Sequence, residues 1–277
     1  MGMRRVVRTI RSFSRVGAIH SQNGEPNQDR IYSKIAGSLY GIALADGAGS
    51  ARYGGLGAEV ACRSACTDVM NSFERYYERE SIGTVKEEVM GKVLAELREH
   101  SAILGLRECL EELGSTLLVL VVDTRDGRFL CLHLGDGLAA CASKDLAGKR
   151  MRLLSAPESG ITRQFTVLTS SKHCIRRTRV YRGKYVTDTS FFLMSDGCTR
   201  YLWNGYEIDP VCGYDLANST GPAWEEEFAD RLQNAEWEGP PDDYSMIAIH
   251  CTSVPYLDLT VLPVQEGIPE KKGRTCR

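Results

Sequence analysis

Three apolar runs of this chain each end in an aspartate followed directly by glycine. Asp46 ends the run in ALADGAGS, Asp136 the run in LHLGDG and Asp196 the run in FFLMSDG. A single Asp-Gly pair is ordinarily a tight turn, because both residues tolerate positive φ angles. A turn is a sufficient interpretation of Asp126-Gly127, which separates two apolar runs. It fits the Asp-Gly pairs at Asp46, Asp136 and Asp196 less well. Acids held at strand ends fit a functional site better.

Two further acidic positions stand just before apolar runs. Asp29 lies in GEPNQDRIYS, and Asp242 begins the acidic pair ahead of MIAIH. Carboxylates that converge from strand ends repel one another strongly unless a cation neutralises them. Oxygen donors without thiols favour Mg²⁺ or Mn²⁺ over zinc, and a glycine after the acid lets its own carbonyl approach the cation. The pattern therefore indicates a divalent metal site.

These acids need strands and helices to hold them. Short apolar runs bounded by turn residues predict strands, and apolar residues at three- and four-residue steps predict helices. The predicted strands are 38–45, 115–123, 128–137, 149–154, 163–170, 175–181, 189–195 and 245–250, and the predicted helices are 56–80, 85–113 and 224–234. Strands on both sides of a helical pair favour an α+β layered domain. We expect one domain over 1–253 and a C-terminal extension over 254–277.

The composition is that of an ordinary globular protein. The 277 residues are 43% hydrophobic and 25% charged, and the formal net charge of −2 argues against a general nucleic-acid binder. No apolar run approaches the roughly 18 residues of a membrane-spanning helix, and the basic start MGMRRVVRTIRSFSR lacks the apolar core of a secretory signal. We expect a cytoplasmic protein without a membrane span, whose start is an ordinary tail or first strand rather than a transit segment.

The ten cysteines point to neither disulfides nor zinc. They are scattered along the chain without a Cys-x-x-Cys pair. Cys62 and Cys66 share a predicted helix face, but the five histidines show no ligand spacing that would complete a metal site with them. We expect most of them to be reduced thiols that pack as small hydrophobic side chains.

In their order and setting, the motifs resemble the metal-dependent protein phosphatase family, protein phosphatase 2C, over about residues 15–249. The matching motifs are NQDR at 27–30, ADGAGS at 45–50, GSTLLVLVV at 114–122, LGDG at 134–137, MSDG at 194–197 and DDYSMIAI at 242–249. The NQD and DGAGSA forms look like the bacterial branch of the family. The resemblance implies a four-layer α-β-β-α sandwich, in which two antiparallel sheets are flanked by helices, with a dinuclear metal centre at one end.

The resemblance also implies roles for individual residues. Asp46 would bridge two Mn²⁺ or Mg²⁺ ions, and the Gly47 carbonyl would bind one of them. Asp196 and Asp242 would complete the protein ligands, while Asp29 would orient metal-bound water. Asp29 and Asp46 are thus the expected catalytic residues, and no further cofactor is implied.

The activity that these roles imply is metal-dependent hydrolysis of phosphoserine and phosphothreonine in proteins. Two metals about 3.5–4 Å apart lower the pKa of a bridging water and hold the phosphate oxygens during in-line attack on phosphorus. No phosphoenzyme forms, so no nucleophilic cysteine is needed. The expected partners are a phosphoprotein substrate and a partner kinase.

Two family residues are missing from this chain. Ala48 replaces the histidine after Asp-Gly, a candidate general acid, so protonation of the leaving group would fall to water or another residue. Gly24 stands where the family usually has a phosphate-binding arginine. His20, Arg30 and Arg52 are candidates to substitute for that arginine, although exposed arginines are more often solvated charges.

The family position of Asp136 is partly structural and partly linked to a third metal ion. Arg200 occupies a place where many relatives carry an acid for that third ion, which disfavours a stable third metal here. In the closing motif, the family spacing selects Asp242 rather than Asp243 as the ligand.

Two other functions are compatible with these departures. One is a non-catalytic phosphatase-like module that senses or binds a partner, and the other is a phosphatase for small phosphorylated metabolites.

Overall fold

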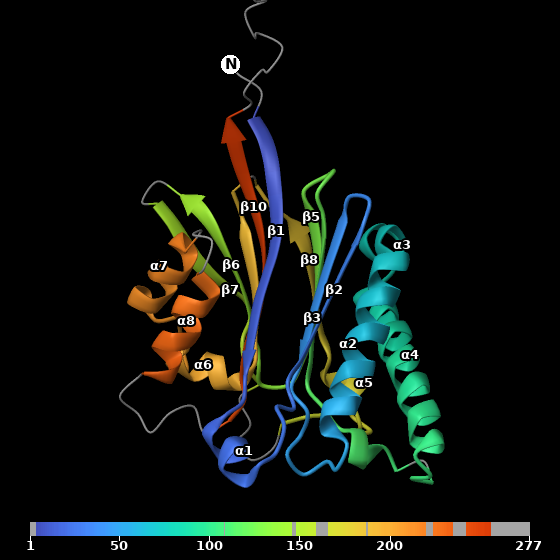
Figure 1. Ribbon diagram of the computed structural model, residues 1–277. Coiled ribbons are helices and arrows are strands. Elements are labelled where there is room, and N and C mark those ends of the chain that lie inside the picture. The colour runs from blue at the N-terminus through green and yellow to red at the C-terminus, as the bar shows by residue number, and fades with distance from the viewer. Residues whose placement is uncertain are drawn as a thin grey trace, which may run out of the picture.

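Two antiparallel sheets face one another in the computed structural model, and helices cover their outer faces (Figure 1). The structure describes residues 4–107, 109–145, 148–158, 166–186, 188–219, 224–234 and 242–255. The first sheet contains, in spatial order, β1 (Arg4–Arg15), β10 (Tyr244–Pro255), β9 (Ser190–Met194), β6 (Leu138–Asp145) and β7 (Gly148–Ser155). The second contains β2 (Arg30–Ala36), β3 (Leu39–Ala45), β4 (Leu117–Asp123), β5 (Arg128–Leu134) and β8 (Arg179–Lys184). The predicted α-β-β-α sandwich is confirmed.

Each sheet has its own helical layer. The second sheet is covered by α2 (Gly54–Asn71), α3 (Phe73–Glu78) and α4 (Ile82–Ile103), and the first by α6 (Asp196–Leu202), α7 (Pro210–Asn218) and α8 (Trp224–Gln233). The shorter helices are α1 (Ala18–Asn23), α5 (Cys174–Arg177) and the 3₁₀ helix Leu110–Leu113. Within the described residues, no helix combines the length and hydropathy needed to span a bilayer.

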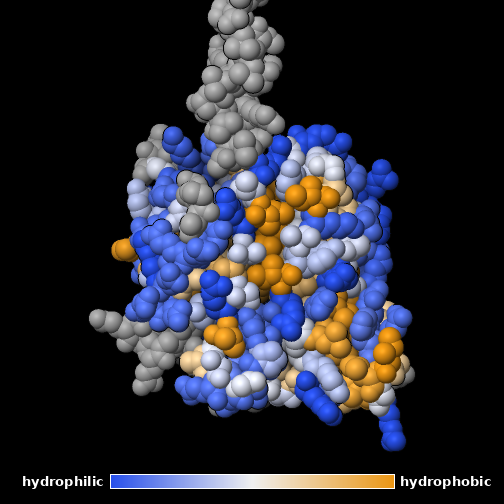
Figure 2. Space-filling view, viewed as in Figure 1, coloured by the Kyte–Doolittle hydropathy of each residue, from blue (hydrophilic) through white to orange (hydrophobic). Residues whose placement is uncertain are grey.

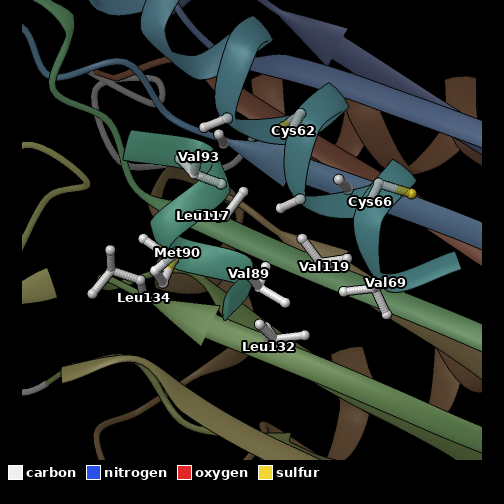
Figure 3. Packing of buried hydrophobic residues seen from close by; sticks show 14 of the residues in the cluster. Cys62, Cys66, Val69, Val89, Met90, Val93, Leu117, Val119, Leu132 and Leu134 are labelled. Carbon is white, nitrogen blue, oxygen red and sulfur yellow. The ribbon is translucent and has the colours of Figure 1, made fainter. Parts of the chain in front are cut away.

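The core between α2, α4 and the second sheet follows from the spacing of small apolar residues on α2. Cys62, Cys66 and Val69 lie on one face of α2 and pack with residues of α4 and of strands β4 and β5 (Figure 3). Both thiols are fully buried, and all the cysteines that the structure describes are free. Six of the described cysteines are buried, two are partly buried and Cys109 is exposed, so the packing predicted for most of the cysteines is confirmed within the described residues.

A second core fills the space between the two sheets. Strand β4 is buried along its whole length because one of its faces meets the helical layer and the other meets the first sheet. This position explains the unbroken apolar run 117–122, since a strand covered on both faces has no solvent-exposed side to make polar.

Several predicted elements have different bounds in the structure. The predicted helix 56–80 is interrupted at Ser72, and the predicted helix 85–113 ends at Ile103. The strand predicted over 175–181 is helical up to Arg177, and in the strand predicted over 163–170 the described residues 166–170 form no strand.

At the two ends of the described chain the strands are longer than expected. The basic start forms β1, which pairs with β10 from Arg4 to Arg15. Strand β10 continues to Pro255, and the rest of the predicted extension 254–277 lies outside the described residues.

The strand ends that carry the acids all lie at one end of the sandwich, the lower end in Figure 1. The pairs Arg30↔Ala45 and Leu138↔Met194 bring the starts of β2 and β6 beside the ends of β3 and β9. Only residues 135–137 separate β5 of the second sheet from β6 of the first, so the corresponding ends of the two sheets are neighbours.

Outside the core, the face shown in Figure 2 is largely hydrophilic. An apolar area lies at its lower right, where Figure 1 places the C-terminal end of α4. Ile103 at this helix end is 74% exposed.

Candidate functional site

The loop after β3 holds Asp46 against the segment that precedes β4. The Asp46 N–H donates to Thr116 Oγ1 at 2.9 Å, and the Thr116 N–H donates back to the Asp46 carbonyl at 2.8 Å. The Ala48 N–H bonds the Gly114 carbonyl at 2.9 Å. Between them, Gly47 has no room for a side chain, because an added Cβ would lie 2.4 Å from the Gly54 carbonyl carbon. The backbone around Asp46 is therefore fixed on both sides.

Asp29 connects the two sheets just before β2. Its side chain is buried, and its Oδ2 accepts a hydrogen bond of 2.8 Å from Ser195 Oγ. The Ser245 N–H donates in turn to Ser195 Oγ at 2.9 Å. Asp29 Oδ1 is buried and has no hydrogen-bond partner in the described part of the chain. Asp29 is thus anchored through one oxygen and keeps the other for a ligand.

Asp196 is the first residue of α6. Its Oδ2 lies 3.6 Å from Nη2 of Arg200, one helical turn along. Its Oδ1 is buried, and within the described residues it has no hydrogen-bond partner. Like Asp29, Asp196 therefore presents one unsatisfied oxygen.

The acidic pair before β10 divides into two roles. Asp243 is buried and accepts hydrogen bonds from the Gly17 N–H at 2.7 Å and from the Gln28 N–H at 2.6 Å. His20 Nδ1 lies 3.0 Å from Asp243 Oδ2. These donors occupy Asp243, whereas Asp242 is partly exposed and bonds the Asp243 N–H at 3.0 Å. The arrangement favours Asp242 for the site and gives Asp243 a structural role.

Electrostatic repulsion marks the five carboxylates as one group. Burial raises the pKa of Asp46 well above its ordinary value, and the charges of Asp29, Asp196, Asp242 and Asp136 raise it further. Burial likewise raises the pKa of Asp29 and of Asp196 to about 7, with further contributions from neighbouring carboxylates. Acids brought together in this way need a cation to ionise at neutral pH.

The donor set fits a divalent cation in its chemistry. Two buried carboxylate oxygens, Asp29 Oδ1 and Asp196 Oδ1, have no partner among the described residues, and hard oxygen ligands suit Mg²⁺ or Mn²⁺. As the side chains stand, no three or more described His, Cys, Asp or Glu residues form a group that could hold a metal ion. In this arrangement the carboxylates alone therefore do not form a ready metal site.

Asp136 lies in the turn between β5 and β6. Its Oδ2 accepts a short hydrogen bond from Thr166 Oγ1. Asp136 thus tethers the segment around Thr166 while its charge contributes to the field at Asp46.

Sequence reasoning missed the residues that hold the acids in place. Thr116 and Ser195 belong to the Gly-Ser-Thr and Ser-Asp-Gly motifs, so their membership of these motifs could have predicted that they contact the acids. The contact of His20 with Asp243 had no such signal, because it joins residues more than 200 positions apart.

Comparison with known proteins gives a family match over most of the chain. Residues 16–242 match the sequence profile described as protein phosphatase 2C. No curated protein is significantly similar to the chain.

Solved structures share the fold at low sequence identity. The catalytic domain of the serine/threonine protein phosphatase PstP, in complex with two manganese ions, is 15% identical with a TM-score of 0.60, and the match covers 90% of this chain and 100% of that one. RsbX in complex with magnesium is 15% identical with a TM-score of 0.56, at 90% and 100% coverage. PppA, described as a key regulatory component of T6SS in Pseudomonas aeruginosa, is 16% identical with a TM-score of 0.62, at 89% and 100% coverage.

Proposed function

Because this chain belongs to the protein phosphatase 2C family, we propose that it is a metal-dependent phosphatase that hydrolyses phosphoserine and phosphothreonine in proteins. The observation that carries the proposal is the gathering of Asp29, Asp136, Asp196 and Asp242 around Asp46, whose pKa their charges raise. A buried group of like charges is unfavourable for folding alone, so its presence supports a cation-binding role.

We assign the metal-binding role to Asp46, the Gly47 carbonyl, Asp196 and Asp242, with two Mn²⁺ or Mg²⁺ ions. Such ions, when bound, supply Lewis acidity toward water and toward the phosphate oxygens. The metals bound by the fold neighbours PstP and RsbX support this choice of ions.

The chain itself contributes orientation. The Gly-Ser-Thr segment fixes the backbone of Asp46, as the mutual bonds with Thr116 indicate. Ser195 holds Asp29 Oδ2, which leaves Asp29 Oδ1 to accept a hydrogen bond from the attacking water. With Ala48 in place of a histidine, we assign protonation of the departing serine or threonine oxygen to solvent.

The test is hydrolysis of phosphopeptides and an aryl phosphate by the purified protein with Mn²⁺ or Mg²⁺. Asp46→Asn should abolish turnover, because it removes the central carboxylate. Asp126→Asn is the matched control, since Asp126-Gly127 forms a hairpin turn between β4 and β5, where Gly127 has a φ of 64°. The proposal fails if the wild type hydrolyses neither kind of substrate with either metal, or if the Asp46 variant keeps the wild-type rate.

A non-catalytic sensing or binding module is the second candidate. It is favoured by one observation: among the described residues, no three or more His, Cys, Asp or Glu side chains are placed so that they could hold a metal ion. Titration calorimetry with Mn²⁺ separates the two candidates, because a degenerate site should bind the ion poorly. A panel of phosphorylated metabolites tests the third, a small-metabolite phosphatase.

We also propose a cytoplasmic location and a partner kinase that installs the phosphate. Cell fractionation, and phosphoprotein levels in cells without this protein, test the two statements separately.

A further inference from the structure

The proposed site lacks the usual phosphate-binding arginine, because Gly24 stands in its place. When its five aspartates are all ionised, they carry one more negative charge than two divalent ions neutralise, before any basic side chain is counted. A phosphomonoester dianion entering such a site meets net repulsion unless a positive side chain receives it. Which positive side chain receives the phosphate is inferred below, and the inference rests on the proposed function.

The first of the sequence candidates, His20, is committed elsewhere, and position 24 itself offers no side chain. Gly24, in the usual arginine position, has a φ of 70° and ends α1. His20 lies against the buried carboxylate of Asp243, with Glu25 3.7 Å from its other ring nitrogen. The His20 side chain is therefore already paired with Asp243 and Glu25.

The two arginines near the Asp46 loop are also engaged. Arg30 Nη1 donates to the carbonyl oxygens of Asn27 at 2.6 Å and Asp29 at 2.8 Å. The Arg52 guanidinium lies over the Tyr53 ring, 5.3 Å from its centroid. Both line a cavity of about 500 Å³ that also contains two glutamates, so the cavity has no net positive charge.

Arg200 has a different environment. It lies one turn after Asp196 on α6, and its Nη2 is 3.6 Å from Asp196 Oδ2. At that distance the two groups form an ion pair without a hydrogen bond, and no group among the described residues accepts a hydrogen bond from the Arg200 guanidinium. Its side chain is 41% exposed, so solvent and substrate can reach it. The ion pair with Asp196 places its positive charge beside the proposed metal ligands.

We propose that Arg200 binds the phosphate group of the substrate and replaces the arginine that is absent at position 24. The planar guanidinium can donate two parallel hydrogen bonds to phosphate oxygens, a geometry that lysine cannot supply. Arg200 stands at the position where relatives are expected to carry an acid for a third metal ion. Its guanidinium therefore supplies a positive charge at that position in this chain.

The test compares Arg200→Met with a matched control, Arg231→Met. Arg231 also pairs with a carboxylate one turn away on a helix, Glu227 on α8, and its side chain is 46% exposed. Binding of inorganic phosphate to the Mn²⁺-loaded protein is measured by calorimetry. Binding of Mn²⁺ alone, and kcat and KM for an aryl phosphate, are measured in parallel.

We expect Arg200→Met to weaken phosphate binding and to raise KM by roughly 10- to 100-fold, the size of a lost charge-assisted contact. Its Mn²⁺ affinity should equal or exceed that of the wild type, because a competing cation has been removed from Asp196. Arg200→Lys should give an intermediate result, and Arg231→Met should match the wild type.

Three results would overturn the inference. They are wild-type phosphate binding by Arg200→Met, a loss of Mn²⁺ affinity that accounts for the whole effect on phosphate, and no phosphate binding by the wild type. Phosphate binding is measured without turnover, so it is separate from the proposed function. A wild type that binds phosphate through Arg200 but hydrolyses nothing would refute the activity and keep the inference.

Discussion

Replacing Asp243 by alanine should destabilise the protein although no proposed metal ligand is removed. The change leaves two backbone donors, the N–H groups of Gly17 and Gln28, without their acceptor, and it leaves His20 without its carboxylate. The N-terminal segment that leads to Asp29 would lose its attachment to the start of β10.

The magnitude follows from the number of orphaned donors. A buried donor left without an acceptor costs about 1–3 kcal/mol, so the buried N–H of Gly17 and the partly buried N–H of Gln28 together cost about 4 kcal/mol. Asp243 also repels the buried Asp29, and relief of that repulsion offsets part of the loss. We expect a net loss of about 3 kcal/mol, which lowers Tm by roughly 6–12 °C in a chain of this size.

The assay is urea unfolding of the metal-free protein, so that metal binding does not enter the comparison. Asp242→Ala is the control, because Asp242 is adjacent in sequence but bonds neither Gly17 nor Gln28. We expect it to stay within about 1 kcal/mol of the wild type, as is typical away from a buried network. The reasoning is refuted if Asp243→Ala also stays within that range, or if both variants are destabilised equally.

Three further predictions concern packing, acid stability and metal binding. Gly57→Ala should be strongly destabilising because its Cβ would lie 1.9 Å from the Leu113 carbonyl oxygen, whereas Gly91→Ala, with open space around it on α4, should stabilise by about 0.5–1 kcal/mol in the same urea experiment. Burial lowers the pKa of His250 from 6.5 to about 4. As the pH falls, the unfolded state therefore takes up a proton at this histidine before the folded state does. This difference removes up to about 3 kcal/mol of folding stability between about pH 6.5 and pH 4. Unfolding of His250→Gln across that range checks this, and an unchanged pH slope would contradict it. Mn²⁺ should raise the Tm of the wild type but not of Asp46→Asn, while the metal-free Asp46→Asn should melt at or above the metal-free wild type because a neutral amide replaces a buried carboxyl whose ionised form its neighbours disfavour.

The central strands were predictable from the sequence because their environment leaves a direct trace in it. Strands β3 and β4 are covered on both faces and so are continuously apolar, and the acids that follow or precede such strands could be recognised from the abrupt change to Asp-Gly. The strand predicted over 163–170 shows the limit of this reasoning, because its described residues 166–170 form no strand. The Thr169 N–H donates to the Ser115 carbonyl, and the Thr169 hydroxyl oxygen accepts from the Ser115 N–H. This segment contains residues that favour strands, but it forms a loop that packs against the Gly-Ser-Thr segment.

The geometry of the site was less predictable than its residues. Which of Asp242 and Asp243 faces the other carboxylates depends on donors that come from Gly17 and Gln28, more than 200 positions earlier. Local propensity carries no information about such contacts. The role of Arg200 was likewise not predictable from local sequence, because it depends on how close its neighbour Asp196 lies to the other acids.

The pairing of β1 with β10 has a consequence for the order of events during synthesis. Strand β10 lies between β1 and β9 in the first sheet, and it is the last described strand to leave the ribosome. The second sheet is complete once β8 has emerged, so it can collapse with α2 and α4 while β1 still lacks its neighbour. Asp242 precedes β10 directly, which makes the assembly of the acidic cluster one of the final steps. A nascent chain would therefore remain without its full set of carboxylates until nearly all of the domain has been translated.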